Sequence, residues 1–276
     1  MKRKILKGFA LLLFSMFFLH ACKKEDDNTK ISVKMTDDPF PVNMINAANI
    51  GLAKIELKDS SGNYVTVFNG NTEINMINYT NGVTTEVSVN SVPEGNYTEA
   101  RISLNGASVE LSDGRIFQAP GSASNTYQVK IYPPVVVPEG ETAELLIDMD
   151  LSDSFGFQAS GWSGWIDDIT DITGLSFFSA DFRAVNLAQT GSIEGSVTDS
   201  NGNNVAYAYV QVQYDYDGDG QAESVSTIAD ANGYYAIIGL PQGTYTVSAE
   251  SGNANGSISN VEVNAQHNIA ANLTIN

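Results

Sequence analysis

The segment Ala143-Glu-Leu-Leu-Ile-Asp-Met-Asp150 alternates between two kinds of side chain with a period of two. Its odd-numbered members are all apolar, and the even-numbered set contains Glu144, Leu146, Asp148 and Asp150. A β-strand places successive side chains on opposite faces, whereas an amphipathic helix repeats every 3.6 residues. The segment therefore predicts a half-buried strand whose carboxylates Asp148 and Asp150 share a solvated face.

The same period returns in residues 245–249 and 269–275. Turn signals separate such stretches: Asp59-Ser-Ser-Gly62, Asp113-Gly114, Asp199-Ser-Asn-Gly202 and Asp230-Ala-Asn-Gly233. No stretch carries a convincing amphipathic helical pattern longer than two turns. Short strands at this spacing are typical of sandwiches, so the sequence predicts an all-β chain with two β-sandwich domains in series.

Charge and composition exclude several classes of function. The chain has 32 acidic and 14 basic residues, and four of the bases lie in the first 21 residues. The remainder is strongly acidic, so nucleic acid and anionic lipid head groups are poor partners. After Cys22 there is no cysteine, and His267 is the one histidine. Thiol proteases, disulfide scaffolds, histidine-based triads and Cys/His zinc sites are therefore excluded.

The N-terminus has the pattern of an export signal. A basic stretch, residues 1–7, precedes eleven mostly apolar residues, 9–19. At about 1.5 Å per residue these cannot cross a bilayer core of about 30 Å. Leu19-His-Ala-Cys22 resembles a bacterial lipobox, which implies that residues 1–21 are a cleaved lipoprotein signal peptide and that Cys22 is lipidated. The alternative is a plain secretory signal with a chance cysteine.

Residues 22–30 are expected to form an acidic tether. Within them, Lys23-Lys-Glu-Asp-Asp27 resembles the lysine-then-acidic signal that directs some lipoproteins to the outer face of the outer membrane. The resemblance implies a lipid-anchored, surface-exposed outer-membrane protein. The alternative is that this short charged run is only solvated.

A domain boundary is expected between residues 186 and 191. Beyond Arg183 the chain has no Lys or Arg but nine acidic residues, and this shift predicts domains 31–186 and 191–276. A turn sequence is echoed in both halves, as Val92-Pro-Glu-Gly-Asn-Tyr-Thr98 and Leu240-Pro-Gln-Gly-Thr-Tyr-Thr246. The echo indicates either duplication or shared turn chemistry.

Two family resemblances fit this division. Gly191-Ser-Ile-Glu-Gly-Ser-Val-Thr198, residues 230–237 and residues 239–247 resemble the carboxypeptidase regulatory-like domains, which are transthyretin-like sandwiches. These are usually non-catalytic spacers or accessory domains, and related sandwiches are grouped with carbohydrate-binding-like folds. Residues 33–39, 92–98, 138–140, 145–155 and 182–185 resemble the bacterial lipoprotein domain of unknown function 4382, which implies location and architecture but no activity.

The sharpest local signal is Tyr214-Asp-Tyr-Asp-Gly-Asp-Gly-Gln-Ala-Glu223. The alternating carboxylates of Asp215, Asp217 and Asp219, followed by Gly220, copy the first half of a calcium loop, and Glu223 could complete a strand-flanked variant that binds Ca²⁺. The EF-hand pattern itself fails, because Ser226 stands where its last Glu belongs. The alternative is an acidic hairpin tip that prevents edge association.

Both tryptophans fall in one Gly/Ser-rich stretch, residues 160–171. Trp162 and Trp165 beside Asp167 and Asp168 could stack on a sugar ring or anchor a partner protein. The alternative, that the rings cap the open end of the sandwich, agrees better with the usual burial of large aromatic side chains.

A third set consists of acidic side chains that two segments could bring together: Asp37, Asp38, Asp148, Asp150 and Asp153. A glycosidase needs two carboxylates across a cleft, but solvated exposure is the simpler interpretation.

His267 is expected at the surface. We expect no enzyme, and instead a lipid-anchored, non-catalytic binding or structural module whose partners are the membrane and an envelope or host protein. The main alternative is a glycan-binding accessory protein.

Overall fold

The computed structural model describes residues 29–38, 44–119, 125–159, 169, 172–177, 179–215 and 220–276. Strands dominate these ranges, which confirms the all-β prediction. The helical segments η2 (Met76–Tyr79), α1 (Leu151–Ser154) and η5 (Leu187–Gln189) each span only three or four residues.

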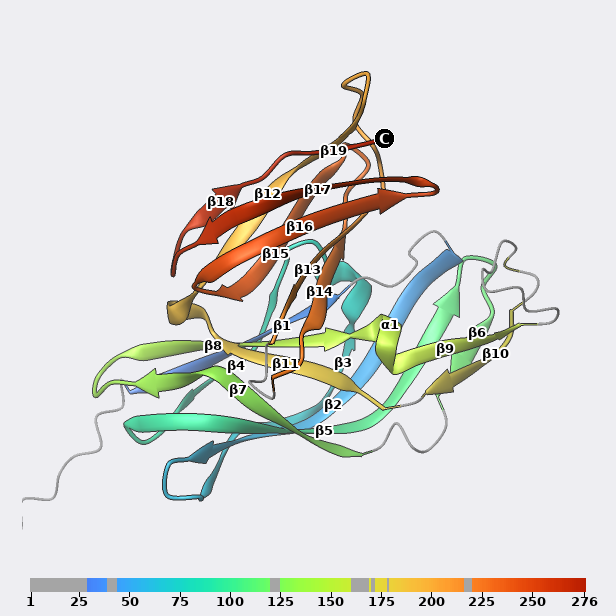
Figure 1. Ribbon diagram of the computed structural model, residues 1–276. Helices are drawn as coiled ribbons and strands as arrows, with labels where there is room; N and C mark the ends of the chain where they lie inside the picture. The colour runs from blue at the N-terminus through green and yellow to red at the C-terminus, as the bar shows by residue number, and fades with distance from the viewer. Residues whose placement is uncertain are drawn as a thin grey trace, which may run out of the picture.

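The first domain is a strongly curved sheet, drawn from blue to yellow in Figure 1. Its strands follow the order β3-β2-β5-β7-β11-β8-β1-β4, and β6 pairs with β5. Their bounds are β1 (Lys30–Asp38), β2 (Ile45–Asp59), β3 (Tyr64–Asn75), β4 (Thr85–Ser91), β5 (Gly95–Leu111), β6 (Ile116–Gln118), β7 (Thr126–Val137), β8 (Thr142–Asp150) and β11 (Asp181–Asn186).

The two edges of this sheet meet. Asn90 on the edge strand β4 donates a side-chain hydrogen bond to the carbonyl of Val67 on the opposite edge strand β3. The curved sheet therefore wraps around one apolar core and leaves little edge exposed. A separate hairpin, β9 (Phe155–Ala159) and β10 (Ile172–Phe177), extends from it.

The second domain is a sandwich of two four-stranded sheets, which confirms the predicted architecture. One sheet has the order β15-β12-β18 with β19 paired to β12, and the other has the order β14-β13-β16-β17. Their bounds are β12 (Thr190–Asp199), β13 (Tyr209–Tyr214), β14 (Glu223–Ile228), β15 (Tyr234–Pro241), β16 (Gly243–Ser251), β17 (Ala254–Val263), β18 (Asn268–Ala270) and β19 (Leu273–Ile275). Its core is formed by residues of this domain.

The Asp-to-Gly turn signals form side-chain-capped turns. At Asp59, Oδ1 accepts the backbone N–H groups two and four residues on, at 2.8 and 2.9 Å. Asp199 does the same at 2.8 and 2.8 Å. These hydrogen bonds favour the charged form and lower the pKa of both carboxyls, with Asn63 and Asn203 as the main donors. The sequence signal and the turn agree because the capping is local.

The second domain stands on the outer face of β8 and β11 (Figure 1). Leu146 and Val185, paired across these strands, point away from the first core and are still fully buried. Gly239 of β15 lies directly over them: a Cβ there would stand 3.0 Å from each side chain, and its φ of +70° also favours glycine. This close approach brings the polar groups of both domains into contact.

Candidate functional site

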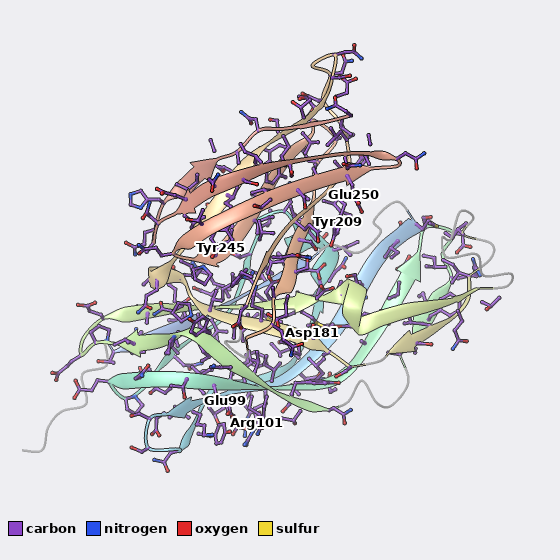
Figure 2. The ribbon with its side chains drawn as sticks, in the orientation of Figure 1. Glu99, Arg101, Asp181, Tyr209, Tyr245 and Glu250 are labelled. Atoms are coloured by element: carbon purple, nitrogen blue, oxygen red, sulfur yellow. The ribbon has the colours of Figure 1, made fainter. Side chains whose placement is uncertain are left out.

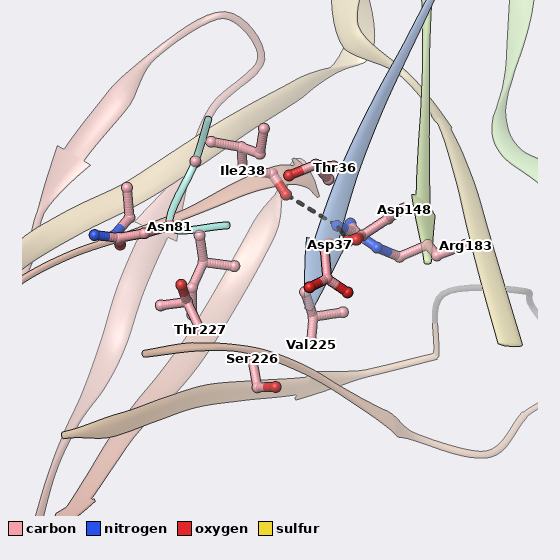
Figure 3. A pocket seen from close by; sticks show the side chains of 12 residues that line it. Thr36, Asp37, Asn81, Asp148, Arg183, Val225, Ser226, Thr227 and Ile238 are labelled. Carbon is pink, nitrogen blue, oxygen red and sulfur yellow. Dashed lines mark hydrogen bonds and ion pairs between the residues drawn. The ribbon is translucent and has the colours of Figure 1, made fainter. Parts of the chain in front are cut away.

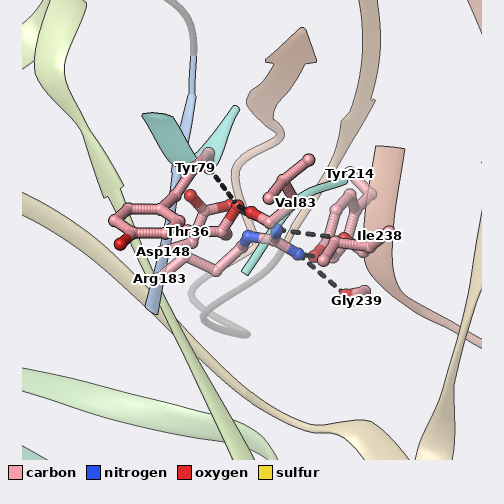
Figure 4. Close-up of polar contacts among 8 residues, drawn as sticks. All are labelled: Thr36, Tyr79, Val83, Asp148, Arg183, Tyr214, Ile238 and Gly239. Carbon is pink, nitrogen blue, oxygen red and sulfur yellow. Dashed lines mark hydrogen bonds and ion pairs between the residues drawn. The ribbon is translucent and has the colours of Figure 1, made fainter. Parts of the chain in front are cut away.

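Arg183 is the centre of a buried polar junction between the domains. On β11 it lies opposite Asp148 on β8, and its Nη2 donates to Asp148 Oδ2 at 2.5 Å. It also reaches into the second domain: Nη1 donates to the carbonyl of Gly239 at 2.7 Å and to the hydroxyl of Tyr214 at 3.0 Å, and Nη2 donates to the carbonyl of Ile238 at 3.1 Å (Figure 4). One side chain therefore joins two strands of the first domain to two of the second.

The expectation that Asp148 is solvated was wrong. Its side chain is 7% exposed because the second domain covers the polar face of β8. The period-two pattern predicts the correct face of the strand for each side chain, but the polar face, which carries Asp148, forms the interface between the domains. Burial raises the pKa of Asp148, and the positive charge of Arg183 opposes this rise. Asp150, at the end of the strand, is half-buried and accepts a hydrogen bond from Ser152.

This ion pair differs from the others in the described part of the chain. Lys34 and Glu144 are 2.6 Å apart, but their side chains are 26% and 47% exposed. Glu99 and Arg101 each belong to a different ion pair, and both lie on β5, on the side of the first domain away from the second (Figure 2). Exposed pairs contribute about 0 to 1 kcal/mol, whereas breaking a buried pair costs about 3 to 5 kcal/mol. Both members of the Arg183–Asp148 pair belong to the first domain, so the pair holds the guanidinium in place for the hydrogen bonds that Arg183 donates to the second domain.

A second contact covers the outer edge of β15. The side chain of Asn81 donates to the carbonyl of Tyr234 at 3.2 Å and accepts from the N–H of Ala236 at 2.7 Å. An amide side chain thus occupies the place of a neighbouring strand. Asn81 has a φ of +54°, a left-handed conformation that asparagine tolerates better than most residues. Together Asn81 and Arg183 satisfy successive backbone groups along one strand edge.

Between these contacts lies a small polar cavity (Figure 3). Its walls include Asp37, Asp148 and Arg183 from the first domain and Ser226 and Thr227 from the second. It has about 10 Å³ of room for the centre of a water-sized guest. Among the described residues these carboxylates therefore do not frame a cleft that could admit a sugar ring. The side chains of Asp38 and Asp153 lie outside the described part of the chain.

Only two of the four predicted calcium ligands lie in the described part of the chain. Asp215 and Glu223 flank the hairpin between β13 and β14, and Asp215 Oδ2 accepts the N–H of Gly220 at 2.9 Å. Asp217 and Asp219 lie outside the described residues, so the site stays a prediction. Within the described ranges, no group of three or more Asp, Glu, His or Cys side chains is arranged to hold a metal.

The remaining predicted residues also fall outside the described ranges. These are Cys22 and the four side chains of the aromatic stretch, Trp162, Trp165, Asp167 and Asp168. The ends of that stretch are described: β9 and β10 pair, with Ile172 opposite Ala159. His267 is exposed, as expected. Over the ranges that are described, no helix is long and apolar enough to cross a membrane.

Sequence reasoning missed the two residues that hold the domains together. Arg183 carries a usable signal, because it is the last basic residue in the chain and interrupts an apolar strand whose neighbours Phe182 and Ala184 are buried. Charged side chains are rarely buried without a partner, so a lone arginine there indicates one. Asn81 carries no comparable signal, since its role depends on a strand edge more than 150 residues away.

Among the solved structures that match the chain are three bacterial proteins, all with low TM-scores. The Bacillus anthracis TIE protein is 11% identical over 90% of this chain and 34% of that one, with a TM-score of 0.24. BcpA, the major pilin subunit of Bacillus cereus, is 11% identical over 90% and 99%, with a TM-score of 0.25. GBS52, the minor pilin of Streptococcus agalactiae, is 10% identical over 88% and 94%, with a TM-score of 0.22. The chain spans about a third of the first of these proteins, and scores of this size establish no shared fold.

Two family models match parts of the chain. No curated protein matches the chain. Residues 28–162 match the Domain of unknown function (DUF4382), and residues 192–276 match the Carboxypeptidase regulatory-like domain. Both resemblances drawn from the sequence are thereby confirmed, in the expected order. The chain therefore matches the DUF4382 model in its N-terminal part and the carboxypeptidase regulatory-like model in its C-terminal part.

Proposed function

We propose that this chain is a lipid-anchored, non-catalytic envelope protein whose two domains act as one rigid unit and present a binding surface away from the membrane. The observation that carries the proposal is the buried junction. Arg183 makes four hydrogen bonds across or beside the interface, and Asn81 makes two more. A flexible linker would leave the domains free to reorient, whereas hydrogen bonds from Arg183 and Asn81 to the second domain favour one orientation.

Rigidity can be measured by small-angle X-ray scattering on the mature chain. The wild-type profile should fit a single domain arrangement. Arg183→Met removes the charge but keeps much of the side-chain volume, and it should broaden the distance distribution while each domain keeps its β-sheet circular dichroism. A wild-type profile that requires many domain orientations would overturn the rigid unit.

Lipidation of Cys22 supplies the membrane anchor in this proposal. Cys22→Ser should move the protein from the membrane fraction to the soluble fraction, because a thioether-linked lipid can no longer form. A cysteine moved to another tether position should not restore retention. Membrane retention of Cys22→Ser would contradict the anchor.

Display on the outer face of the outer membrane rests on the Lys23–Asp27 run. External protease should digest the protein on intact cells, and replacing the run with neutral residues should abolish this digestion. Protection of both forms would place the protein on the periplasmic side, where the partners would be envelope proteins.

Glycan binding is the second candidate function. It rests on the two tryptophans, which lie between the paired strands β9 and β10, so the stretch begins and ends on one hairpin. Trp162→Ala and Trp165→Ala should each abolish retention on a glycan array that binds the wild type, because stacking on a sugar needs the ring faces. Phe68→Ala, far from this hairpin in sequence, serves as a control for non-specific loss. Binding unchanged in both tryptophan variants would reject this function.

Calcium is proposed as a ligand of the acidic hairpin. Asp215, Asp217, Asp219 and Glu223 repel one another when the site is empty, so Ca²⁺ should raise the melting temperature and EDTA should lower it. Asp217→Asn with Asp219→Asn should remove that response. An unchanged melting temperature in EDTA would show that the hairpin tip has no bound calcium.

A further inference from the structure

The cavity at the domain junction is lined by oxygen atoms from both domains. Asp37 and Asp148, on the neighbouring strands β1 and β8, contribute carboxylates, and Ser226 and Thr227 of β14 contribute hydroxyls (Figure 3). All four residues are at most 5% exposed. The space, about 10 Å³ for the centre of a guest, holds one particle the size of a water molecule.

Two of these oxygen atoms have no protein partner. Among the residues that the structure describes, no hydrogen-bonding group reaches Asp148 Oδ1 or Thr227 Oγ1, and both atoms are inaccessible to bulk solvent. A buried oxygen left in this state costs about 1 to 3 kcal/mol, and more when the group is charged. The atoms lie on opposite sides of the domain interface, so a guest in the cavity would interact with both domains.

The charges indicate what kind of guest fits. Arg183 supplies one positive charge against the two carboxyls of Asp37 and Asp148, and Asp150 adds a further negative charge near Asp148. With both lining carboxyls ionised, Asp37, Asp148 and Arg183 together have a net charge of −1, before the half-buried Asp150 is counted. A neutral water would leave that charge uncompensated, whereas one monovalent cation would balance it.

We propose that the junction cavity binds one small monovalent cation of the size of sodium. Carboxylate and hydroxyl oxygens are suitable ligands for such a hard cation. A divalent ion fits less well, because it would overcompensate the cluster and Ca²⁺ takes six to eight oxygen ligands. The cation would hold the two domains together, so that ion binding and domain docking are coupled. This inference rests on the junction alone, and its failure would leave the proposed function standing.

The test compares melting temperatures of the full mature chain in sodium chloride and in tetramethylammonium chloride at equal concentration and pH. Tetramethylammonium matches the ionic strength but is too large for the cavity. At ten times its dissociation constant, sodium should raise the melting temperature by about 3 to 6 °C, and the rise should saturate. Equal melting temperatures in the two salts would overturn the proposal.

Two variants locate the effect. Thr227→Val keeps the side-chain shape, removes the hydroxyl and should lose the sodium response while it remains folded in both salts. Asp148→Asn makes the cluster neutral and should lose the response as well. Lys34→Gln removes an exposed ion pair between β1 and β8, away from the cavity lining, and should keep the sodium response. A melting temperature that rises equally in both salts as the pH is lowered would show that a proton neutralises the cluster, which would also overturn the proposal.

Discussion

The two domains contain the same corner in different surroundings. In the first, Tyr97 donates its hydroxyl hydrogen to the carbonyl of Pro93, four residues back, at 2.9 Å. In the second, Tyr245 does the same to Pro241 at 2.7 Å. Burial raises the pKa of both tyrosines, so the hydroxyls stay protonated and can donate. The echo in the sequence therefore corresponds to one local structure formed twice.

The neighbours of the two corners differ. Tyr97 belongs to the core of the first domain. Tyr245 lies at the end of β16 nearer the first domain and meets Tyr214 edge-on, with ring centroids 5.7 Å apart (Figure 2). Tyr214 in turn accepts a hydrogen bond from Arg183 across the junction. The same seven-residue pattern thus places a tyrosine in the core of each domain, and only in the second does that tyrosine also contact a residue of the interface. Local turn chemistry therefore does not determine everything that a turn packs against.

The largest effect is expected from breaking the junction. Arg183→Met leaves Asp148 buried without its countercharge and should lower the free energy of unfolding by about 3 to 5 kcal/mol in chemical denaturation. Adding Asp148→Leu should recover most of this loss, because the uncompensated charge is gone. Lys34→Met, which breaks an exposed pair, should cost at most about 1 kcal/mol. A loss of at most about 1 kcal/mol for Arg183→Met would contradict the importance of the buried Arg183–Asp148 ion pair.

The corner tyrosines should have smaller and nearly equal effects. Tyr97→Phe and Tyr245→Phe keep the ring and remove one hydrogen bond, so each should cost about 1 to 3 kcal/mol, because a carbonyl loses its buried donor. Denaturant unfolding of both variants checks this. A cost for Tyr245→Phe far above that for Tyr97→Phe would show that this corner also supports the junction, and the two corners would then not be equivalent.

The strand-edge contact should contribute less than the buried ion pair. Asn81→Gly keeps the left-handed backbone and removes both side-chain hydrogen bonds, for an expected loss of about 1 to 2 kcal/mol. Asn81→Asp keeps the acceptor for Ala236 and should lose about half as much at neutral pH. Equal unfolding free energies for the wild type and Asn81→Gly would contradict the role of Asn81 in covering β15.

The smallest effect concerns the matched turns at Asp59 and Asp199. Both pKa values are lowered in the folded chain, so each carboxylate stabilises it above the unfolded pKa of about 3.9, and that stability is lost as the pH falls through the lower folded pKa. Asp59→Asn and Asp199→Asn should flatten the acid limb of the melting curve measured from neutral pH to below pH 3. Because the turns are alike, the melting temperatures of the two variants should depend on pH in the same way below neutral pH. A clear difference between them would show that the two turns are not equivalent.

Much of the fold could be predicted from local pattern. The period of two at residues 143–150 gave a strand with Leu145, Ile147 and Met149 in the core, and all three are fully buried. The candidate site could not be predicted in the same way. The period predicts a solvated Asp148, because it separates one face of the strand from the other but does not say what covers the second face.

The sequence by itself determined the strands, the capped turns, the two corners and the family resemblance of both domains, because each depends on residues a few positions apart or on a pattern within one segment. Tertiary structure alone decided that Arg183 meets Asp148, that Asn81 covers β15, and that four oxygen-bearing side chains surround one cavity. The Arg183–Asp148 and Asn81–Ala236 hydrogen bonds join residues 35 and 155 positions apart. Whether a polar side chain is solvated or buried depends on such distant partners, since burial of charge is favourable only where the whole fold brings a countercharge to it.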